Sequence, residues 1–226
     1  MKPSIFVLPL LCFAFIVGCS PDAPPAPAEP AKKDPVAEMR SQAEKGDAKA
    51  QRQLGLAYSK GEGVPKDATE AAAWFRKAAD QNLAQAQNNL GICYEEGSGV
   101  TKDVTEAAKW YRKAADQGYA DAQFNLGLCY NEGVGVAQDA AEAVKWFKLA
   151  AEQNFAEAQY NLGVCYDDGV GTAKDPVEAV KWYSLAAQQG NLNAAQCRDS
   201  AMKMLTSDQL AVIEKLVKEF QPSKAP

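Results

Sequence analysis

The sequence has no histidine among its 226 residues, and this absence excludes several kinds of chemistry. Histidine metal sites, Ser-His-Asp and Cys-His catalysis and imidazole pH switches all require that side chain. The chain also lacks a basic surplus, because 24 Lys and Arg stand against 29 Asp and Glu for a net charge of −5. Binding to a nucleic-acid backbone needs clustered positive charge. We therefore expect no metal site, no cofactor and no nucleic-acid partner.

The first apolar run, from Ile5 to Val17, is shorter than the roughly 20 residues that a membrane-spanning helix needs. It fits the centre of a secretory signal. The run ends Ile16-Val17-Gly18-Cys19, which resembles the lipobox of bacterial lipoproteins. The resemblance implies a lipoprotein signal peptide over residues 1–18, cleavage before Cys19, and acylation of Cys19, palmitate included. A plain signal peptide that happens to contain a cysteine is the alternative.

A proline-rich segment follows this cysteine, and half of the chain's 12 prolines lie between residues 20 and 35. Such a segment buries too little apolar surface to fold and is typical of a stiff, extended tether. We expect the lipidated Cys19 and this tether to occupy residues 19–34. Gram-negative lipoproteins kept in the inner membrane commonly have Asp after the cysteine. Ser20 therefore favours the outer membrane, with the domain facing the periplasm.

A 36-residue period fills the rest of the chain. It relates the four tryptophans, a Leu-Gly pair, a tyrosine and a Gly-x-Gly loop. The columns are Trp74, Trp110, Trp146, Trp182; Gly55, Gly91, Gly127, Gly163; and Tyr58, Tyr94, Tyr130, Tyr166. A period of this length indicates an array of small supersecondary units. We predict units over 47–82, 83–118, 119–154 and 155–190, a capping helix over 35–46, and a degenerate repeat with a second capping helix over 191–226.

Each unit is predicted to contain two helices. The second helix begins at an aspartate that recurs every 36 residues and is followed three residues later by glutamate. This pattern is typical of a helix N-cap. It ends at a residue that tolerates a left-handed backbone. The aspartates are Asp67, Asp103, Asp139 and Asp175, and the ends lie near Asn82, Gly118, Asn154 and Gly190. We expect the glycine after each leucine to admit a neighbouring backbone, and the tryptophans to fill the space between units.

The repeated string resembles the Sel-one-like repeat, a branch of the tetratricopeptide superfamily. Its pattern is Ala-x-x-x-Leu-Gly-x-x-Tyr-x-x-Gly-x-Gly-Val, then Asp, then Ala-x-x-Trp-(Phe/Tyr)-x-x-Ala-Ala. The resemblance covers about residues 47–190. It implies an all-α, right-handed α-solenoid of helix-turn-helix repeats whose usual role is to hold proteins together.

Three cysteines, Cys93, Cys129 and Cys165, share one repeat column, in which the first unit has Ala57. A column shared with alanine favours a small apolar side chain. Equivalent helices in stacked units should lie about 8–10 Å apart, beyond the roughly 7 Å Cα limit of a disulfide. We expect buried free thiols, and a Cys165–Cys197 bond remains the alternative.

An enzymatic alternative comes from cysteine-rich relatives that have been linked to penicillin binding and β-lactamase activity. The string Ser200-Ala201-Met202-Lys203 has the Ser-x-x-Lys spacing of such enzymes. A matching Lys-Thr-Gly is lacking, and the absence of histidine removes a zinc variant. We expect no catalytic residues, and a secreted hydrolase is the alternative function.

Tetratricopeptide arrays line a concave groove with their first helices, and this resemblance points to two groups of partner-binding residues. The first varies in character from unit to unit: Arg52, Asn88, Phe124 and Tyr160. The second ends the same helices: Glu95, Glu96, Glu132, Asp167 and Asp168. Exposed aromatics are typical binding anchors, and acidic residues draw basic ligands. A merely solvated face is the alternative. We predict a monomeric, lipid-anchored scaffold that binds a protein or peptide with basic and apolar residues.

Overall fold

The computed structural model describes residues 35–223, and within this range all regular structure is helical. The predicted signal peptide, Cys19 and tether lie outside the described residues. The helices are α1 (Pro35–Glu44), α2 (Ala48–Lys60), α3 (Ala68–Asp80), α4 (Ala84–Glu96), α5 (Val104–Asp116), α6 (Ala120–Glu132), α7 (Ala140–Glu152), α8 (Ala156–Asp168), α9 (Pro176–Gln188), α10 (Leu192–Ala201), the 3₁₀ turn η1 (Met202–Met204) and α11 (Ser207–Glu219).

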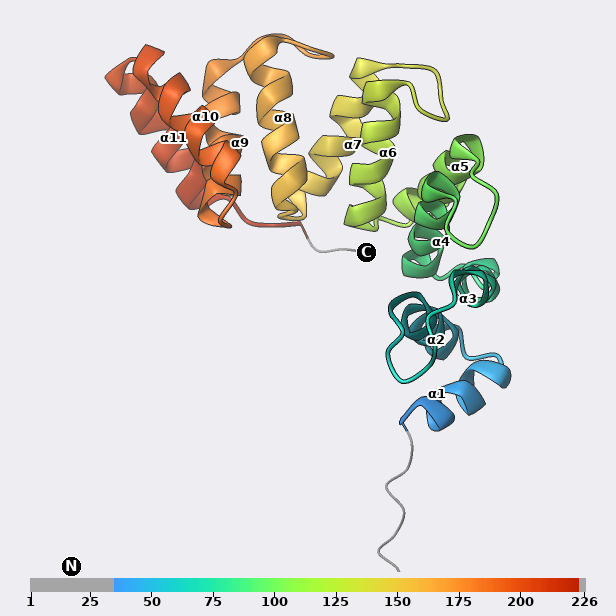
Figure 1. The fold of residues 1–226 in the computed structure, drawn as a ribbon. Helices are drawn as coiled ribbons and strands as arrows, with labels where there is room; N and C mark the ends of the chain where they lie inside the picture. Colours follow the sequence, from blue (N-terminus) through green and yellow to red (C-terminus); the bar gives the residue numbers. More distant parts are fainter. Residues whose placement is uncertain (1–34, 224–226) are drawn as a thin grey trace, which may run out of the picture. The chain divides into compact units, whose positions relative to one another are not determined.

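Helices α2 to α9 form four consecutive pairs, each with a first and a second helix (Figure 1). The second helix of each pair also packs against the first helix of the next pair. Helix α1 packs against α2 in the same way as the second helix of one pair packs against the first helix of the next. Helix α10 packs against α9 and occupies the place of a fifth first helix. The prediction of an all-α solenoid built from repeated helix pairs is confirmed.

The ends of the helices follow the residues that the sequence marks. Asp67, Asp103, Asp139 and Asp175 each accept hydrogen bonds from two backbone N–H groups of the following helix. Each second helix is then stopped by a residue with a positive φ, and two of these four residues are asparagines, Asn82 at 64° and Asn154 at 68°. The fixed ends hold every first helix in the same register relative to its partner.

The glycine column packs against an aromatic ring rather than against a neighbouring backbone. A Cβ placed on Gly127 would lie 2.6 Å from ring carbons of Phe147, in the second helix of the same pair. Gly55, Gly91 and Gly163 face Phe75, Tyr111 and Tyr183 in the same way. The expectation of backbone approach is therefore corrected, since the missing side chain makes room for a ring.

The tryptophans lie in hydrophobic clusters that join the second helix of the preceding pair to the first helix of their own pair, as expected of residues that fill the space between units. Trp110 belongs to the cluster of α3 and α4, and Trp182 to that of α7 and α8. Trp182 is 3% exposed and Trp110 is 5% exposed, whereas Trp146 is half-buried. The column is core, but its burial is not uniform.

A buried glutamine column, which the sequence analysis did not identify, ties the pairs together. Gln123 Nε2 donates to the Ala115 carbonyl of the preceding second helix, and its Oε1 accepts from Gln153 Nε2 at 2.7 Å. Gln51, Gln87 and Gln159 make the same contacts in the other three pairs. Because a buried amide must be satisfied, these bonds fix the angle between successive helices.

Candidate functional site

The first helices of the four pairs present one stripe of residues that neither helix neighbour buries. On α4 this stripe is Gln85, Asn89, Ile92 and Glu96, which are three or four residues apart and therefore share a face. The adjoining side of the same helix carries the buried Ala86, Leu90 and Cys93. The equivalent stripes of α2, α4, α6 and α8 together form what we call the first-helix face.

The middle of the first-helix face is an apolar column flanked by amides. The apolar side chains are half-buried in all four helices: Leu56, Ile92, Leu128 and Val164. The amide column beside them is Gln53, Asn89, Asn125 and Asn161. Apolar side chains half open to solvent, next to hydrogen-bonding amides, suit contact with an extended chain.

Carboxylates lie at the edge of this face that is formed by the C-terminal ends of the first helices. Glu96, Glu132 and Asp168 are exposed in the last turns of α4, α6 and α8, where the first repeat has Lys60. Negative charge at a helix C-terminus opposes the helix dipole, so these residues do not stabilise their own helices. Among the described residues, none of the three forms an ion pair.

Glu95 and Asp167, which directly precede Glu96 and Asp168, differ from each other in their exposure and contacts. Glu95 is exposed and accepts a hydrogen bond from the buried Tyr111 hydroxyl. Burial, followed by this bond and the charge of Glu95, raises the pKa of Tyr111. Asp167 is half-buried. Glu95 therefore has a structural contact as well as an exposed carboxylate.

A cavity of about 280 Å³ opens between α2 and α4 at the acidic end of the first-helix face. Leu56, Ile92 and Phe75 supply its apolar wall, and Asn89 and Glu96 supply polar groups. A cavity of this size is smaller than a typical small-molecule pocket and matches one apolar side chain of a partner.

The first predicted group lies at the joints between successive first helices and not in the middle of the face. Arg52 Nε donates to Asn89 Oδ1 at 3.0 Å. Asn88 is 5% exposed and accepts from Asn125, so the expectation that it lines an open groove is wrong.

Phe124 and Tyr160 are half-buried rather than exposed. The Phe124 ring lies 5.3 Å from that of Phe155 and 5.9 Å from that of Phe147. The Tyr160 ring lies 6.1 Å from that of Tyr183 and packs in a cluster that includes Cys197 of α10. Both rings are used in packing between helices, which corrects the expectation of free anchors.

The residues that sequence reasoning missed are the apolar column of Ile92 and the amide column of Asn89. Both obey the same 36-residue period as the tryptophans. On a helix, Ile92 lies about 160° and Asn89 about 100° around the axis from the buried Leu90, and this angular separation was the signal available. Variability was a poorer guide than angular position on the helix.

The four cysteines of the described part are all free, Cys165 and Cys197 included. Burial, with smaller contributions from nearby carboxylates, raises the pKa of Cys93, Cys129 and Cys165 to about 11. These thiols are protonated at neutral pH and are poor nucleophiles. Their place is in the core, as predicted.

Residues 35–223 contain the Ser-x-x-Lys string that suggested a hydrolase. Ser200 and Lys203 are both exposed, in α10 and η1. No group of three or more Cys, Asp or Glu side chains in this range is arranged to hold a metal ion. None of the helices within it is long and apolar enough to cross a membrane.

The Sel1 repeat family model matches residues 48–83, 84–119, 120–155 and 156–191. The chain belongs to the Sel1 repeat family. Each match begins with the first helix of a pair and continues to the start of the next. Sel1 repeat proteins generally mediate protein–protein interactions and are generally non-catalytic scaffolds.

Solved structures agree with this assignment. A Sel1 repeat protein from Oxalobacter formigenes is 33% identical, with a TM-score of 0.68 over 82% of this chain and 84% of that one. The protective antigen c5321 of uropathogenic Escherichia coli, which displays an SLR fold, is 46% identical, with a TM-score of 0.69 over 70% of this chain. The chain spans 34% of that relative's length.

The immunity protein PA5088 from Pseudomonas aeruginosa shares the fold at 23% identity, with a TM-score of 0.50 over 85% of this chain and 76% of that one. No curated protein matches the chain.

Proposed function

We propose that this Sel1 repeat protein is a non-catalytic scaffold whose first-helix face binds a protein or peptide segment carrying basic and apolar residues. The observation that carries the proposal is one arrangement repeated on successive helices. A half-buried apolar side chain, such as Ile92 or Leu128, stands one helical turn before an exposed carboxylate without an ion pair. The carboxylates destabilise their own helix ends, so their benefit lies outside the helix.

The two parts of this arrangement would contribute differently to binding. Exposed carboxylates speed the encounter with a basic segment and are sensitive to salt. The apolar column and the cavity beside Leu56 would bury the partner's apolar side chains and set how slowly it leaves. Phe124 and Tyr160, already packed, would contribute through the shape of the joints.

The acidic residues favour a basic partner over a nucleic acid, because phosphate would be repelled from the last turns of α4, α6 and α8. Their positions on successive repeats also favour an extended segment that crosses several first helices. The first helices of one chain would then form the whole binding surface, and the protein would act as a monomer.

The proposal is tested by photo-crosslinking in intact cells. Leu128 is replaced by a photoreactive phenylalanine analogue, and the matched control carries it at Lys109, exposed on the second helix α5. We expect a defined adduct from position 128 and none of the same mass from position 109. The same adducts from both positions, or an adduct from 109 alone, would contradict the assignment of the face.

We also propose that the protein is lipid-anchored through Cys19 and faces the periplasm from the outer membrane. The support is the lipobox-like string that ends at Cys19 and the serine that follows it. Cys19→Ser should remove the lipid mass from the amino terminus and release the protein from membranes. Unchanged membrane fractionation, together with a wild-type amino terminus free of lipid, would disprove anchoring.

A further inference from the structure

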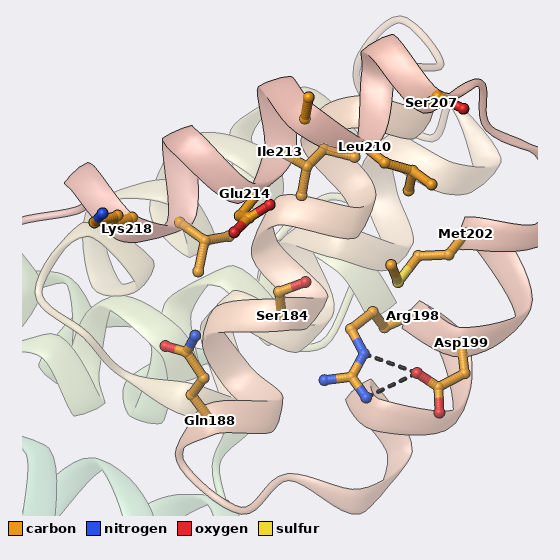
Figure 2. Close-up of a pocket in the computed structure, with 12 residues that line it drawn as sticks. Ser184, Gln188, Arg198, Asp199, Met202, Ser207, Leu210, Ile213, Glu214 and Lys218 are labelled. Carbon is orange, nitrogen blue, oxygen red and sulfur yellow. Dashed lines mark hydrogen bonds and ion pairs between the residues drawn. The ribbon is translucent and has the colours of Figure 1, made fainter.

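A cavity of about 900 Å³ lies between α10 and α11, away from the first-helix face. Figure 2 shows its walls. Leu210, Ile213 and Glu214 come from α11, Arg198 from α10 and Met202 from η1, with Ser184 of α9 between them. This volume is in the range of ligand-binding pockets and exceeds that of one side chain.

The cavity exists because the last helix pair does not close. In each of the four repeats a glycine of the first helix faces an aromatic ring of the second, and both stand eight residues after their N-caps. In the last pair the N-caps are Asn191 and Thr206, and the corresponding residues are Asp199 and Glu214.

Two carboxylates cannot reproduce the packing of a ring on a glycine. Asp199 adds side-chain atoms where the four repeats leave room for a ring, and Glu214 supplies a carboxylate in place of that ring. Helix α11 packs instead along α9, where Ile213 is 4% exposed and Phe220 meets Trp182 edge to face at 5.9 Å. The space between α10 and α11 remains open.

The walls suit an aromatic ring. Met202 is 36% exposed, and Leu210 and Val217 are half-buried. A ring that lies between them would have both of its faces shielded from water, which favours binding. The Arg198 guanidinium is held in place by Asp199, with Nε and Nη2 at 2.8 and 2.7 Å from Oδ1. A guanidinium so fixed presents a flat face for stacking on a ring.

The cavity wall carries two cations, Arg198 and Lys218, and two carboxylates, Asp199 and Glu214. Glu214 is exposed at the cavity wall and forms no ion pair in the part of the chain that the structure describes. Asp199 is already paired with Arg198. Glu214 is thus the carboxylate available to a positively charged group of a ligand.

We propose that this cavity binds an aromatic side chain of a protein partner, next to a lysine or arginine. The ring lies among Met202, Leu210 and Val217, beside the Arg198 guanidinium, and the cation pairs with Glu214. The site is separate from the first-helix face. It binds an aromatic side chain next to a basic residue, whereas the first-helix face binds aliphatic and basic side chains.

The test uses the full chain in detergent, with its methionine methyl groups labelled with ¹³C for NMR. Met202 reports on the cavity, whereas Met39 in α1 and Met204, which is 90% exposed, serve as internal controls. The probe is the capped tripeptide Lys-Trp-Lys, with Lys-Leu-Lys and Gln-Trp-Gln as matched controls. We expect Lys-Trp-Lys to shift the Met202 methyl signal saturably and to leave Met39 and Met204 unchanged.

The control peptides and variants separate the ring from the charge. Lys-Leu-Lys should give no saturable shift. Gln-Trp-Gln should bind roughly two- to fivefold more weakly, the effect of one exposed ion pair. Glu214→Gln should weaken Lys-Trp-Lys by the same factor and leave Gln-Trp-Gln unchanged, and Glu62→Gln, exposed after α2 and outside the cavity, should change neither.

A closing variant gives the decisive result. Asp199→Gly combined with Glu214→Tyr restores the pair found in the four repeats, so we expect it to abolish the Met202 response without lowering the helix content. The proposal is overturned if Lys-Trp-Lys leaves Met202 unmoved, if Met39 and Met204 shift equally, or if the closing variant binds like wild type. Leu128→Ala should leave the response intact, so this site and the first-helix face fail independently.

Discussion

The guanidinium of Arg112 in α5 lies over the indole ring of Trp146 in α7, with Cζ 4.9 Å from the ring centroid. The same group donates a hydrogen bond to the hydroxyl of Tyr130 in α6. Arg112 thus contacts both helices of the following repeat. Arg76 does the same one repeat earlier, with Tyr94 and Trp110.

The next joint along the chain is built differently. Lys148 replaces the arginine, is exposed, and reaches only Glu152 at 4.0 Å. Here the segment after α11 crosses from α9 to α7, because the Ser223 N–H donates to the Glu152 carbonyl at 2.7 Å. The C-terminal segment therefore covers the joint that lacks an arginine.

Arg112→Ala should lower the free energy of unfolding by about 1–2 kcal/mol, since it removes a cation–π contact and a charge-assisted hydrogen bond that join two repeats. Urea denaturation followed by circular dichroism measures the change. Lys109→Ala on the same helix is the control, because its exposed ion pair with Glu106 should be worth less than about 0.5 kcal/mol. Equal effects of the two variants would show that Arg112 does not hold the joint.

The tryptophans should differ in their contribution to stability according to burial. Trp110→Ala should cost about 3–5 kcal/mol, the usual range for emptying a large aromatic core site. Trp182→Ala should fall in the same range, because the ring is 3% exposed, donates from Nε1 to Glu178 and is covered by Phe220. Position in the chain alone predicts a smaller loss for Trp182, since terminal repeats fray more readily.

Trp146→Ala should cost least of the three, because that ring is half-buried. Chemical denaturation of the three variants gives the order. A loss for Trp146 as large as that for Trp110 would contradict the dependence on burial.

Buried thiols should make stability fall in alkali. Burial raises the pKa of Cys93, Cys129 and Cys165 from about 9 to about 11. Below pH 9 the thiols are protonated in both states and have no effect. Between pH 9 and 11 they ionise in the unfolded chain first, so the unfolded state binds fewer protons and the free energy of unfolding falls as pH rises.

The matched control replaces all three cysteines with alanine, the residue that Ala57 supplies at this position in the first repeat. The free energy of unfolding is measured at pH 8 and pH 11 for both proteins. We expect a larger loss in the wild type. Equal losses would mean that the thiols ionise as readily in the folded protein.

The sequence was sufficient to predict the repeat and the ends of its second helices, because each of these ends has a local physical cause. Asp103 is an N-cap wherever a helix follows it, and Gly118 permits a positive φ in any context. The period then extends these local rules along the chain. The ring that packs on Gly127 was not predicted, since the partner of a glycine depends on how two helices cross.

The candidate site was predicted less well for the same reason. Asn88 and Phe124 vary between repeats as surface residues do, yet Asn88 is buried and bonded to Asn125 of the next first helix, and Phe124 packs against Phe147 and Phe155. Glu96 and Asp168 were placed correctly at exposed helix ends. The opening between α10 and α11 follows from Asp199 and Glu214. The effect of these residues becomes clear only when they are compared with the glycine and the aromatic residue at the equivalent positions of the four repeats.

The most direct test of the first-helix face is the kinetics of binding to the partner segment identified by photo-crosslinking, measured at low and high salt. Glu96→Gln combined with Asp168→Asn should mainly slow association, and salt should have the same effect on the wild type. Leu128→Ala should mainly speed dissociation and should do so at both salt concentrations. If both variants associate and dissociate like the wild type under both conditions, the first-helix face is not the binding surface.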